Sequence, residues 1–487
     1  KNRYYATLTV RADGSTKFAP GKQWGYFPAG SIAWRISNEK WMKPIKFISD
    51  LKLRASYGLA GNNRIGNDLW HNIYRVYSGT SAPAFGNEEY NYYQFADQTY
   101  LYDPDLKWET TITRNIGLDF GFFRNRLSGT VDVYWNTTKD LLVPSIIPNS
   151  SGYSRQMTNV GQTSNKGVEI SLDAKIIQTK DFQLSANFNV AFNKNKVDKL
   201  ATGETEWKTK ASLSNWYGTY NYKMEVGKSM GLIYGFVNDG FYKVDDFDFD
   251  ATTKKWTLKP GIPDNSSFSS GNFAFKPGAM KFKKLSDSES NLITEDDMTV
   301  IGDTNPKVTG GFGLSGNWKN LDFTAFFNYM CDFDVLNVNK LYLHSAVRRN
   351  YSNLSTDMNL ANRFRYVDDA GVNVSSDPVA LAALNENAKT YSWMSVTQGI
   401  TMTDLVEDGS FLRLSTLTVG YTLPKHWLRS LGVKSLRLYF SGSNLFTITG
   451  YSGYDPEVNI QKGLTPGIDN NVTPRSRVYT VGVNLNF

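Results

Sequence analysis

Apolar and polar residues alternate along much of this chain with the two-residue period of β-strands. The last segment shows it most clearly, because its apolar positions are Tyr479, Val481, Val483, Leu485 and Phe487. The positions between them are small or polar. A strand with one apolar face, ending in an aromatic residue, suits a wall between lipid and water. An edge strand of a soluble sheet would show the same local pattern, so the rest of the chain has to decide.

The same alternation recurs at residues 51–59, 168–176, 182–192, 321–329 and 436–440. These segments run for about 10 to 13 residues, which exceeds the usual soluble strand and fits a tilted crossing of a bilayer. Counting backwards from the C-terminus gives about twelve strands, beginning near Tyr4 to Val10. We therefore predict an all-β fold, a transmembrane antiparallel β-barrel wall.

The two faces of each predicted strand differ in character. We expect the apolar register positions to face lipid, among them Leu184, Phe188, Phe323 and Phe327. Asn187 and Thr324 fall on the other face, which we expect to line the lumen.

Connections between the predicted strands fall into two classes. Short ones lie at residues 124–126, 178–181 and 319–320, and long ones at 61–111, 138–164, 194–306, 332–409 and 447–473. Long and short connections alternate, which is typical of outer-membrane barrels with short periplasmic turns and long outer loops. A soluble β-sandwich gives no reason for this alternation. We therefore expect the long loops outside and the C-terminus in the periplasm, with a short amphipathic helix near residues 424–429.

Composition agrees with a membrane wall built from strands. Aromatic residues make up 14% of the 487 residues, yet no apolar run approaches the roughly 18 residues that a membrane helix needs. The net charge of +7 comes from 53 basic residues scattered among 46 acidic ones, without the basic stripe that nucleic acid selects. We therefore expect no nucleic-acid partner.

The chain offers few metal ligands. Its one cysteine, Cys331, cannot form an intramolecular disulfide or a zinc site alone. The three histidines, His71, His344 and His426, are far apart, and we expect each in a turn or at the surface. No catalytic motif has local support, so we predict neither an enzyme nor a cofactor.

Several strings resemble one known family. They include ADGSTKFAP at 12–20, WRISNEKWM at 34–42, LKLRASYGLAGN at 51–62, NVGQTSNKGVEISL at 159–172, EDGSFLRLSTLTVGYTLP at 407–424 and SGSNLFTITGYSGYDPEV at 441–458. Together, in this order, they make the chain similar to the C-terminal half of SusC/RagA-like TonB-dependent outer-membrane transporters.

The resemblance implies a plugged barrel of the 22-stranded class in the bacterial outer membrane. We expect residues 1–487 to be its C-terminal portion, because nothing here resembles the plug, the TonB box or the first strands. The family imports oligomeric nutrients, usually oligosaccharides and sometimes peptides. A SusD-like surface lipoprotein forms the lid, the TonB complex supplies energy through the plug, and transporter–lipoprotein pairs can form dimers.

The C-terminal strand also has an expected partner. Tyr479, Val483, Leu485 and Phe487 form a predicted membrane insertion signal for the barrel-assembly machinery, with outer-membrane lipid against the finished wall.

Aromatic and basic residues in the long loops are candidate contacts for substrate or lid. These candidates are Tyr92, Tyr93, Trp207, Trp216, Tyr217, Arg348, Arg349, Tyr391 and Trp393. Aromatic rings can stack on sugars or anchor a protein partner, and guanidinium groups can meet acidic ligands. For any one aromatic residue, packing of the loops against each other is the commoner explanation. The arginines can equally be solvated.

One segment invites a calcium interpretation. In relatives, a loop with acidic residues at alternate positions precedes the VIG string found here at 300–302. In this chain the equivalent positions are Ser286, Ser288 and Ser290, with Asp297 at the last acidic position. Neutral hydroxyls are poor ligands for a hard cation, so we expect no bound calcium. An outer-membrane barrel enzyme and a surface adhesin remain alternatives of other functional classes.

Overall fold

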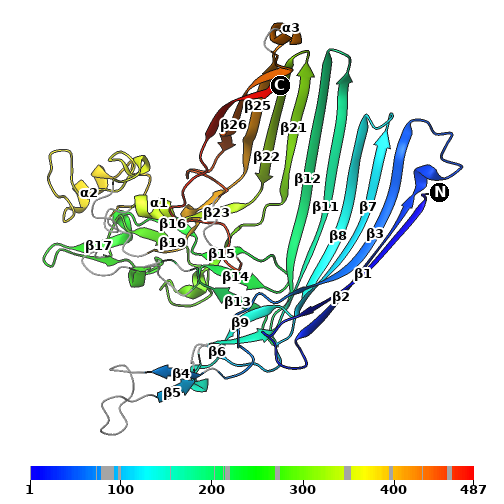
Figure 1. Cartoon of the computed structure of the whole chain (residues 1–487). Helices are drawn as coiled ribbons and strands as arrows, with labels where there is room; N and C mark the ends of the chain where they lie inside the picture. Colours follow the sequence, from blue (N-terminus) through cyan, green and yellow to red (C-terminus); the bar gives the residue numbers. More distant parts are fainter. Residues whose placement is uncertain are drawn as a thin grey trace.

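A single antiparallel sheet of twelve strands dominates the computed structural model (Figure 1). Its strands are β1 (Tyr4–Gly14), β2 (Trp24–Arg35), β3 (Ile48–Asn62), β7 (Glu109–Phe122), β8 (Leu127–Lys139), β11 (Gln162–Gln178), β12 (Phe182–Lys199), β21 (Val308–Trp318), β22 (Leu321–Cys331), β25 (Phe411–Thr422), β26 (Ser435–Thr449) and β28 (Val478–Asn486). The sheet, called the wall below, confirms the predicted fold class. The structure describes residues 2–72, 74–77, 93–96, 100–153, 155–201, 203–211, 213, 220–268, 275–344, 353–393, 399–429, 432–457 and 463–487.

The register of the wall sorts its side chains onto two faces. Phe188 of β12 pairs with Phe312 of β21, which pairs with Phe327 of β22, so these residues share one face. Asn187 pairs with Gly313 on the opposite face. The face that carries Phe188 is called the apolar face below. Because burying charges in lipid is costly, we assign the apolar face to lipid, and this assignment stays a prediction.

The opposite face, called the polar face, carries ion pairs between strands. Arg54 of β3 pairs with Asp119 at 2.8 Å and with Asp132 at 3.0 Å, and Lys52 joins Asp119 at 2.6 Å. Further along the wall, Arg437 pairs with Asp322. This face can carry ion pairs because water reaches it, as expected for a face that lines a lumen.

Connections alternate between the two ends of the wall, as predicted. Residues 36–47, 123–126, 179–181, 319–320 and 423–434 join strands at one end, the turn end. The much longer connections all lie at the other end, the loop end (Figure 1). The predicted amphipathic helix is α3 (Lys425–Leu428), in a turn-end connection. Among the described residues, no helix combines the length and apolarity that crossing a bilayer requires.

The C-terminal strand pairs with β26 over its whole length. Leu485 lies opposite Leu436, and Val483 lies opposite Leu438, so the predicted alternation of β28 is present. Tyr479 and Phe487 are largely exposed. In the order of the described strands, β28 and β1 lie at opposite ends of the wall.

The long connections fold into a structured assembly beside the loop end of the wall, called the loop body. Its strands are β13 (Glu206–Thr209), β14 (Tyr222–Glu225), β15 (Leu232–Gly235), β16 (Asn238–Phe241), β17 (Phe247–Asp250), β18 (Lys255–Leu258), β19 (Met280–Phe282), β20 (Thr299–Asp303), β23 (Asp334–Asn337), β24 (Val406–Asp408) and β27 (Ile468–Asp469). Its helices are α1 (Val338–Leu343) and α2 (Pro378–Leu384). Smaller strands nearer the N-terminus are β4 (Tyr74–Tyr77), β5 (Tyr93–Ala96), β6 (Tyr100–Leu101), β9 (Leu142–Ile146) and β10 (Arg155–Asn159).

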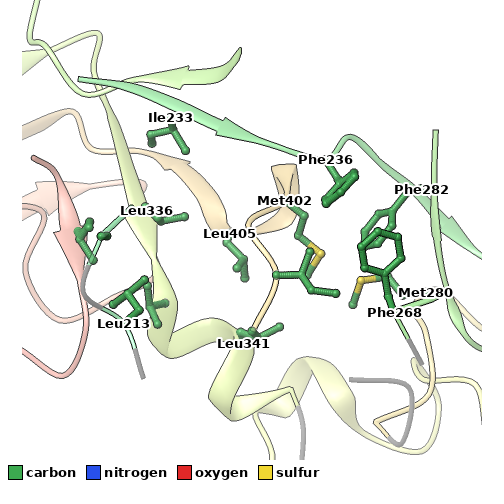
Figure 2. Close-up of a cluster of buried hydrophobic side chains, with 14 of the residues drawn as sticks. Leu213, Ile233, Phe236, Phe268, Met280, Phe282, Leu336, Leu341, Met402 and Leu405 are labelled. Atoms are coloured by element: carbon green, nitrogen blue, oxygen red, sulfur yellow. The ribbon is translucent and has the colours of Figure 1, made fainter. Parts of the chain in front are cut away.

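The loop body has its own hydrophobic core, drawn from three loops that are far apart in sequence. Tyr222 and Ile233 come from the first loop, Leu336 and Met402 from the second, and Ile468 from the third. All five are fully buried. Figure 2 shows Phe236, Phe268 and Phe282 together at one end of this core. The loops therefore fold as one unit, because none of them could bury this much apolar surface alone.

Candidate functional site at the junction of wall and loop body

Amide side chains join the loop body to the wall at β12. The side-chain oxygen of Asn195 accepts a hydrogen bond from the backbone N–H of Met230 at 2.7 Å. Its Nδ2 donates to Oδ1 of Asn305 at 2.7 Å. Asn305 in turn donates to the carbonyl of Met230 and to Asp303. These paired donors and acceptors fix the orientation of the first long loop against the strand that it leaves.

A hollow of about 860 Å³ opens at this junction. Its lining includes Tyr134, Gly167 and Asn193, which pair in register across the wall, and Lys228 and Asn305 from the loop body. The wall residues Trp135, Lys166 and Lys194 also border it. Tyr134 donates a hydrogen bond to Oδ1 of Asn193 at 2.8 Å. A Cβ at Gly167 would lie 2.5 Å from the Tyr134 hydroxyl, so the tyrosine can lie across the sheet only because this residue is glycine. Phenol, amide and ammonium groups offer both donors and acceptors, which suits hydroxyl-rich or amide-rich ligands.

A buried arginine fastens the third long loop to the wall. Arg413 of β25 is 2% exposed, and its guanidinium contacts Asp455 at 2.5 Å and Glu457 at 2.7 Å. Its Nε donates to Thr447 of β26 at 3.0 Å. Arg475 adds a second cation on Glu457 at 2.9 Å. This cluster is called the Arg413 clamp below. The string around Asp455 and Glu457 carries part of the family resemblance, but nothing in the sequence pairs it with Arg413. The available signal was a charged residue between the leucines Leu412 and Leu414 of a predicted strand.

A buried carboxylate organises the segment with the calcium interpretation. Asp297 is fully buried and accepts hydrogen bonds from the backbone N–H groups of Leu285, Ser286 and Thr294 at 2.8 to 2.9 Å. The ammonium group of Lys284 lies 3.1 Å from the same carboxylate. Four donors therefore already contact this group. Among the described residues, no group of three or more His, Cys, Asp or Glu side chains is arranged to hold a metal ion.

We expect Asp297→Asn to destabilise the loop body by about 2 to 3 kcal/mol, because the amide places a donor among donors and leaves Lys284 without its anion. Although burial alone would raise the pKa of Asp297, its hydrogen bonds lower it from 3.8 to about 2. A lowered pKa contributes stability above the unfolded value of 3.8, and this contribution is lost as the pH falls toward 2. Hydrogen exchange of residues 284–298 between pH 5 and pH 2.5 measures both effects. Exchange in D297N with the same pH dependence as wild type would contradict this role.

Of the candidate contact residues from sequence, three have described side chains. Tyr391 is 2% exposed and lies in the core of the loop body, where its hydroxyl meets Nδ1 of His344 at 3.2 Å. Trp393 packs against the same core, and Trp207 is partly exposed on β13. For Tyr391 the structure favours the packing interpretation. Tyr92, Trp216, Tyr217, Arg348 and Arg349 lie outside the described residues, as does the side chain of Tyr93.

His344 lies in the turn that follows α1, in agreement with the prediction of a surface or turn position, but its side chain is buried. This residue caps the C-terminus of α1 and is 7% exposed. Burial, reinforced by Lys340, lowers the pKa of its imidazole, so the residue packs as a neutral ring. An isolated histidine carries no apolar periodicity that would reveal such a position.

Comparison with known proteins agrees with this architecture. The family model described as "TonB dependent receptor-like, beta-barrel" matches residues 1–445. TonB-dependent receptor P3 of Formosa agariphila is 32% identical over 492 residues, and TonB-dependent receptor SusC of Bacteroides thetaiotaomicron is 30% identical over 498 residues. Both alignments cover all of this chain but only 44% and 42% of those proteins, so the chain spans less than half their length.

The solved structures give the same result. The RagAB peptide transporter matches the whole chain with a TM-score of 0.73 and 26% identity, over 46% of that chain. The "closed-closed" state of the RagAB peptide importer matches with a TM-score of 0.70 and 27% identity. The wall with its loop body, the strings of the sequence and these matches agree: the chain belongs to the TonB-dependent receptor-like β-barrel family.

Proposed function

We propose that this chain forms part of an outer-membrane importer of oligomeric nutrients, with oligosaccharides as the substrate class. The family consists of transporters rather than enzymes. The observation that carries the proposal is the folded loop body at one end of a long wall, with a hollow of mixed polar and apolar lining at their junction. In the proposed orientation the loop body lies outside, the C-terminus is periplasmic, and the TonB complex supplies energy through a region beyond this chain.

A peptide importer of the same family is the second candidate. The likeness to RagAB, which is named a peptide transporter, favours it. The hollow itself suits either class, because amide and phenol groups bind sugar hydroxyls and peptide amides equally well. Growth of the native host on single glycans or on peptides, with and without the full-length gene, separates the two. An adhesin would leave growth unchanged in both media.

We also propose that the loop body contacts a SusD-like surface lipoprotein. The contact surface that we select is the α2 lobe, residues 353–393, which lies at the end of the loop body away from the wall (Figure 1). Phe364, Tyr366 and Leu381 form its small core. Val367, Val372 and Val379 nonetheless point outward, with 45%, 56% and 80% of their surface exposed. Three exposed valines on one lobe provide an apolar surface for a protein partner.

Replacing Val372 and Val379 together by glutamate is expected to reduce co-purification of the lipoprotein with the full-length protein by at least about tenfold. Burying two valines in an interface contributes about 3 kcal/mol, and glutamate removes that and adds desolvated charge. Pull-down from detergent-solubilised outer membranes measures the effect.

The matched control is Val226→Glu with Leu292→Glu, two exposed apolar residues elsewhere on the loop body. Unchanged co-purification in V372E/V379E, with the barrel folded, would refute this choice of surface. Deleting a whole loop is a poorer experiment, because the loops share one core.

A further inference from the structure

A row of three basic and two aromatic residues crosses the apolar face of the wall near its loop end. Lys166 of β11 pairs with Lys194 of β12 on one side and with Trp135 of β8 on the other. Arg114 of β7 pairs with Tyr57 of β3 and donates from Nη1 to the carbonyl of Trp135 at 3.4 Å. These five residues, called the cationic row, therefore run side by side across five neighbouring strands.

The residues on either side of the cationic row place it at a polarity boundary. One register step toward the turn end, the face is wholly apolar, with Ile116 opposite Val133, Val133 opposite Val168, and Val168 opposite Phe192. One step toward the loop end, Thr137 faces Ser164, which faces Lys196. Aromatic and basic residues at such a boundary are typical of the membrane interface, where head groups meet acyl chains.

The three cations lack acidic partners within the described part of the chain. None of Arg114, Lys166 and Lys194 has a carboxylate oxygen within 4.0 Å, unlike Lys196 one step away, which pairs with Asp198 at 3.5 Å. The nearby carboxylates Asp132 and Glu169 pair with each other in register on the opposite face, beside Arg54. Among the residues that the structure describes, the guanidinium of Arg114 donates to the Trp135 carbonyl and the Thr137 hydroxyl, both from Nη1 at 3.4 and 3.2 Å, and so retains further donors.

An apolar groove leads away from the cationic row. It has a volume of about 660 Å³, and its lining includes Arg114, Trp135, Leu8, Ile32 and Ile116. Gly30 also lines it, and a Cβ added there would meet nothing closer than 3.7 Å. The combination of unpaired cations and an adjoining apolar groove matches a molecule with an anionic head and a hydrocarbon tail.

We propose that the cationic row and its groove bind a phosphorylated anionic lipid of the surrounding leaflet. The phosphate lies against Arg114, Lys166 and Lys194, and one acyl chain follows the groove past Ile32 and Ile116. Guanidinium and ammonium groups supply charge-assisted hydrogen bonds to phosphate oxygens. With the loop end outside, this leaflet is the outer one. By strand register the cationic row lies on the face opposite Tyr134 and Asn193, although Trp135, Lys166 and Lys194 also border the hollow at the junction of wall and loop body.

The test is native mass spectrometry of the delipidated full-length protein, titrated with dioleoyl phosphatidic acid, with dioleoyl phosphatidylcholine or with inorganic phosphate. We expect phosphatidic acid to bind about tenfold more tightly than phosphatidylcholine, and R114Q/K166Q/K194Q to abolish that preference. The control K175Q/K180Q/K319Q removes the same charge from the opposite face and the turns and is expected to keep it. The single variant K194Q, expected to weaken binding about threefold, provides the measurement should the triple variant not fold.

Gly30→Leu separates a lipid from a free anion. A leucine side chain would project into the groove and obstruct it, so we expect weaker binding of phosphatidic acid in G30L and unchanged binding of inorganic phosphate. Equal lipid preference in the two triple variants would overturn the proposal. Complete displacement of phosphatidic acid by an equal concentration of inorganic phosphate would also overturn it, by assigning the site to free anions. If the full-length wild-type protein binds the lipid but supports no uptake of glycan or peptide, the proposed function fails and the lipid site stands.

Discussion

Replacing Arg413 by alanine is expected to destabilise the loop body by about 3 to 5 kcal/mol, the largest loss that we expect from one substitution outside the core. Asp455 is 4% exposed and would remain buried without its cation. Thr447 would also lose the Nε donor. Residues 450–457, which the Arg413 clamp holds against β25 and β26, would then separate from the wall.

Hydrogen exchange of residues 450–457 in the full-length protein measures this release. The matched control is Arg437→Ala, whose partner Asp322 is 32% exposed and water-accessible, so its loss should cost no more than about 1 kcal/mol. Arg413→Met combined with Asp455→Asn and Glu457→Gln removes the charge of Arg413 and of both its carboxylate partners and should recover most of the protection. Equal exchange in R413A and R437A would show that burial adds nothing to this interaction.

The wall could be predicted from sequence because its information is local. Side chains of a strand alternate with period two, so residues 182–192 alone show which positions share a face. The observed pairing of Phe188 with Phe312 and of Leu485 with Leu436 follows that parity. Short turns such as residues 319–320 then force neighbouring strands together, and the order of the twelve strands follows.

The loop body could not be predicted in the same way, because its core depends on distant partners. Ile233, Leu336 and Ile468 are all buried together, yet each comes from a different connection. Nothing in the local pattern around Tyr391 distinguishes a ring in this core from one that meets a ligand. The Arg413 clamp was missed for the same reason, since Arg413 and Asp455 meet only after two strands have paired.

The cationic row illustrates an intermediate case. Lys166 and Lys194 each interrupt an alternating segment, and alone each resembles an ordinary surface lysine near a strand end. Only the register of β11 and β12 places them opposite each other. A sequence pattern thus reveals which face a residue occupies, whereas the neighbours across that face require the structure.

If the apolar face contacts lipid, replacing Phe188 by arginine is expected to destabilise the wall. Phe188 lies in the middle of the apolar register of residues 184–192 and is 38% exposed on the face that we assign to lipid. Arginine near the bilayer midplane costs about 2 to 4 kcal/mol, because the guanidinium loses its hydration. Asn187→Arg is the matched control, since Asn187 is exposed on the polar face and pairs in register with Asp173. Unfolding of the full-length protein from lipid vesicles by urea should show a lower free energy of unfolding for F188R but not for N187R. If N187R lowers it as much, or F188R does not lower it, the two faces have been assigned wrongly, and the cationic row would then face the lumen.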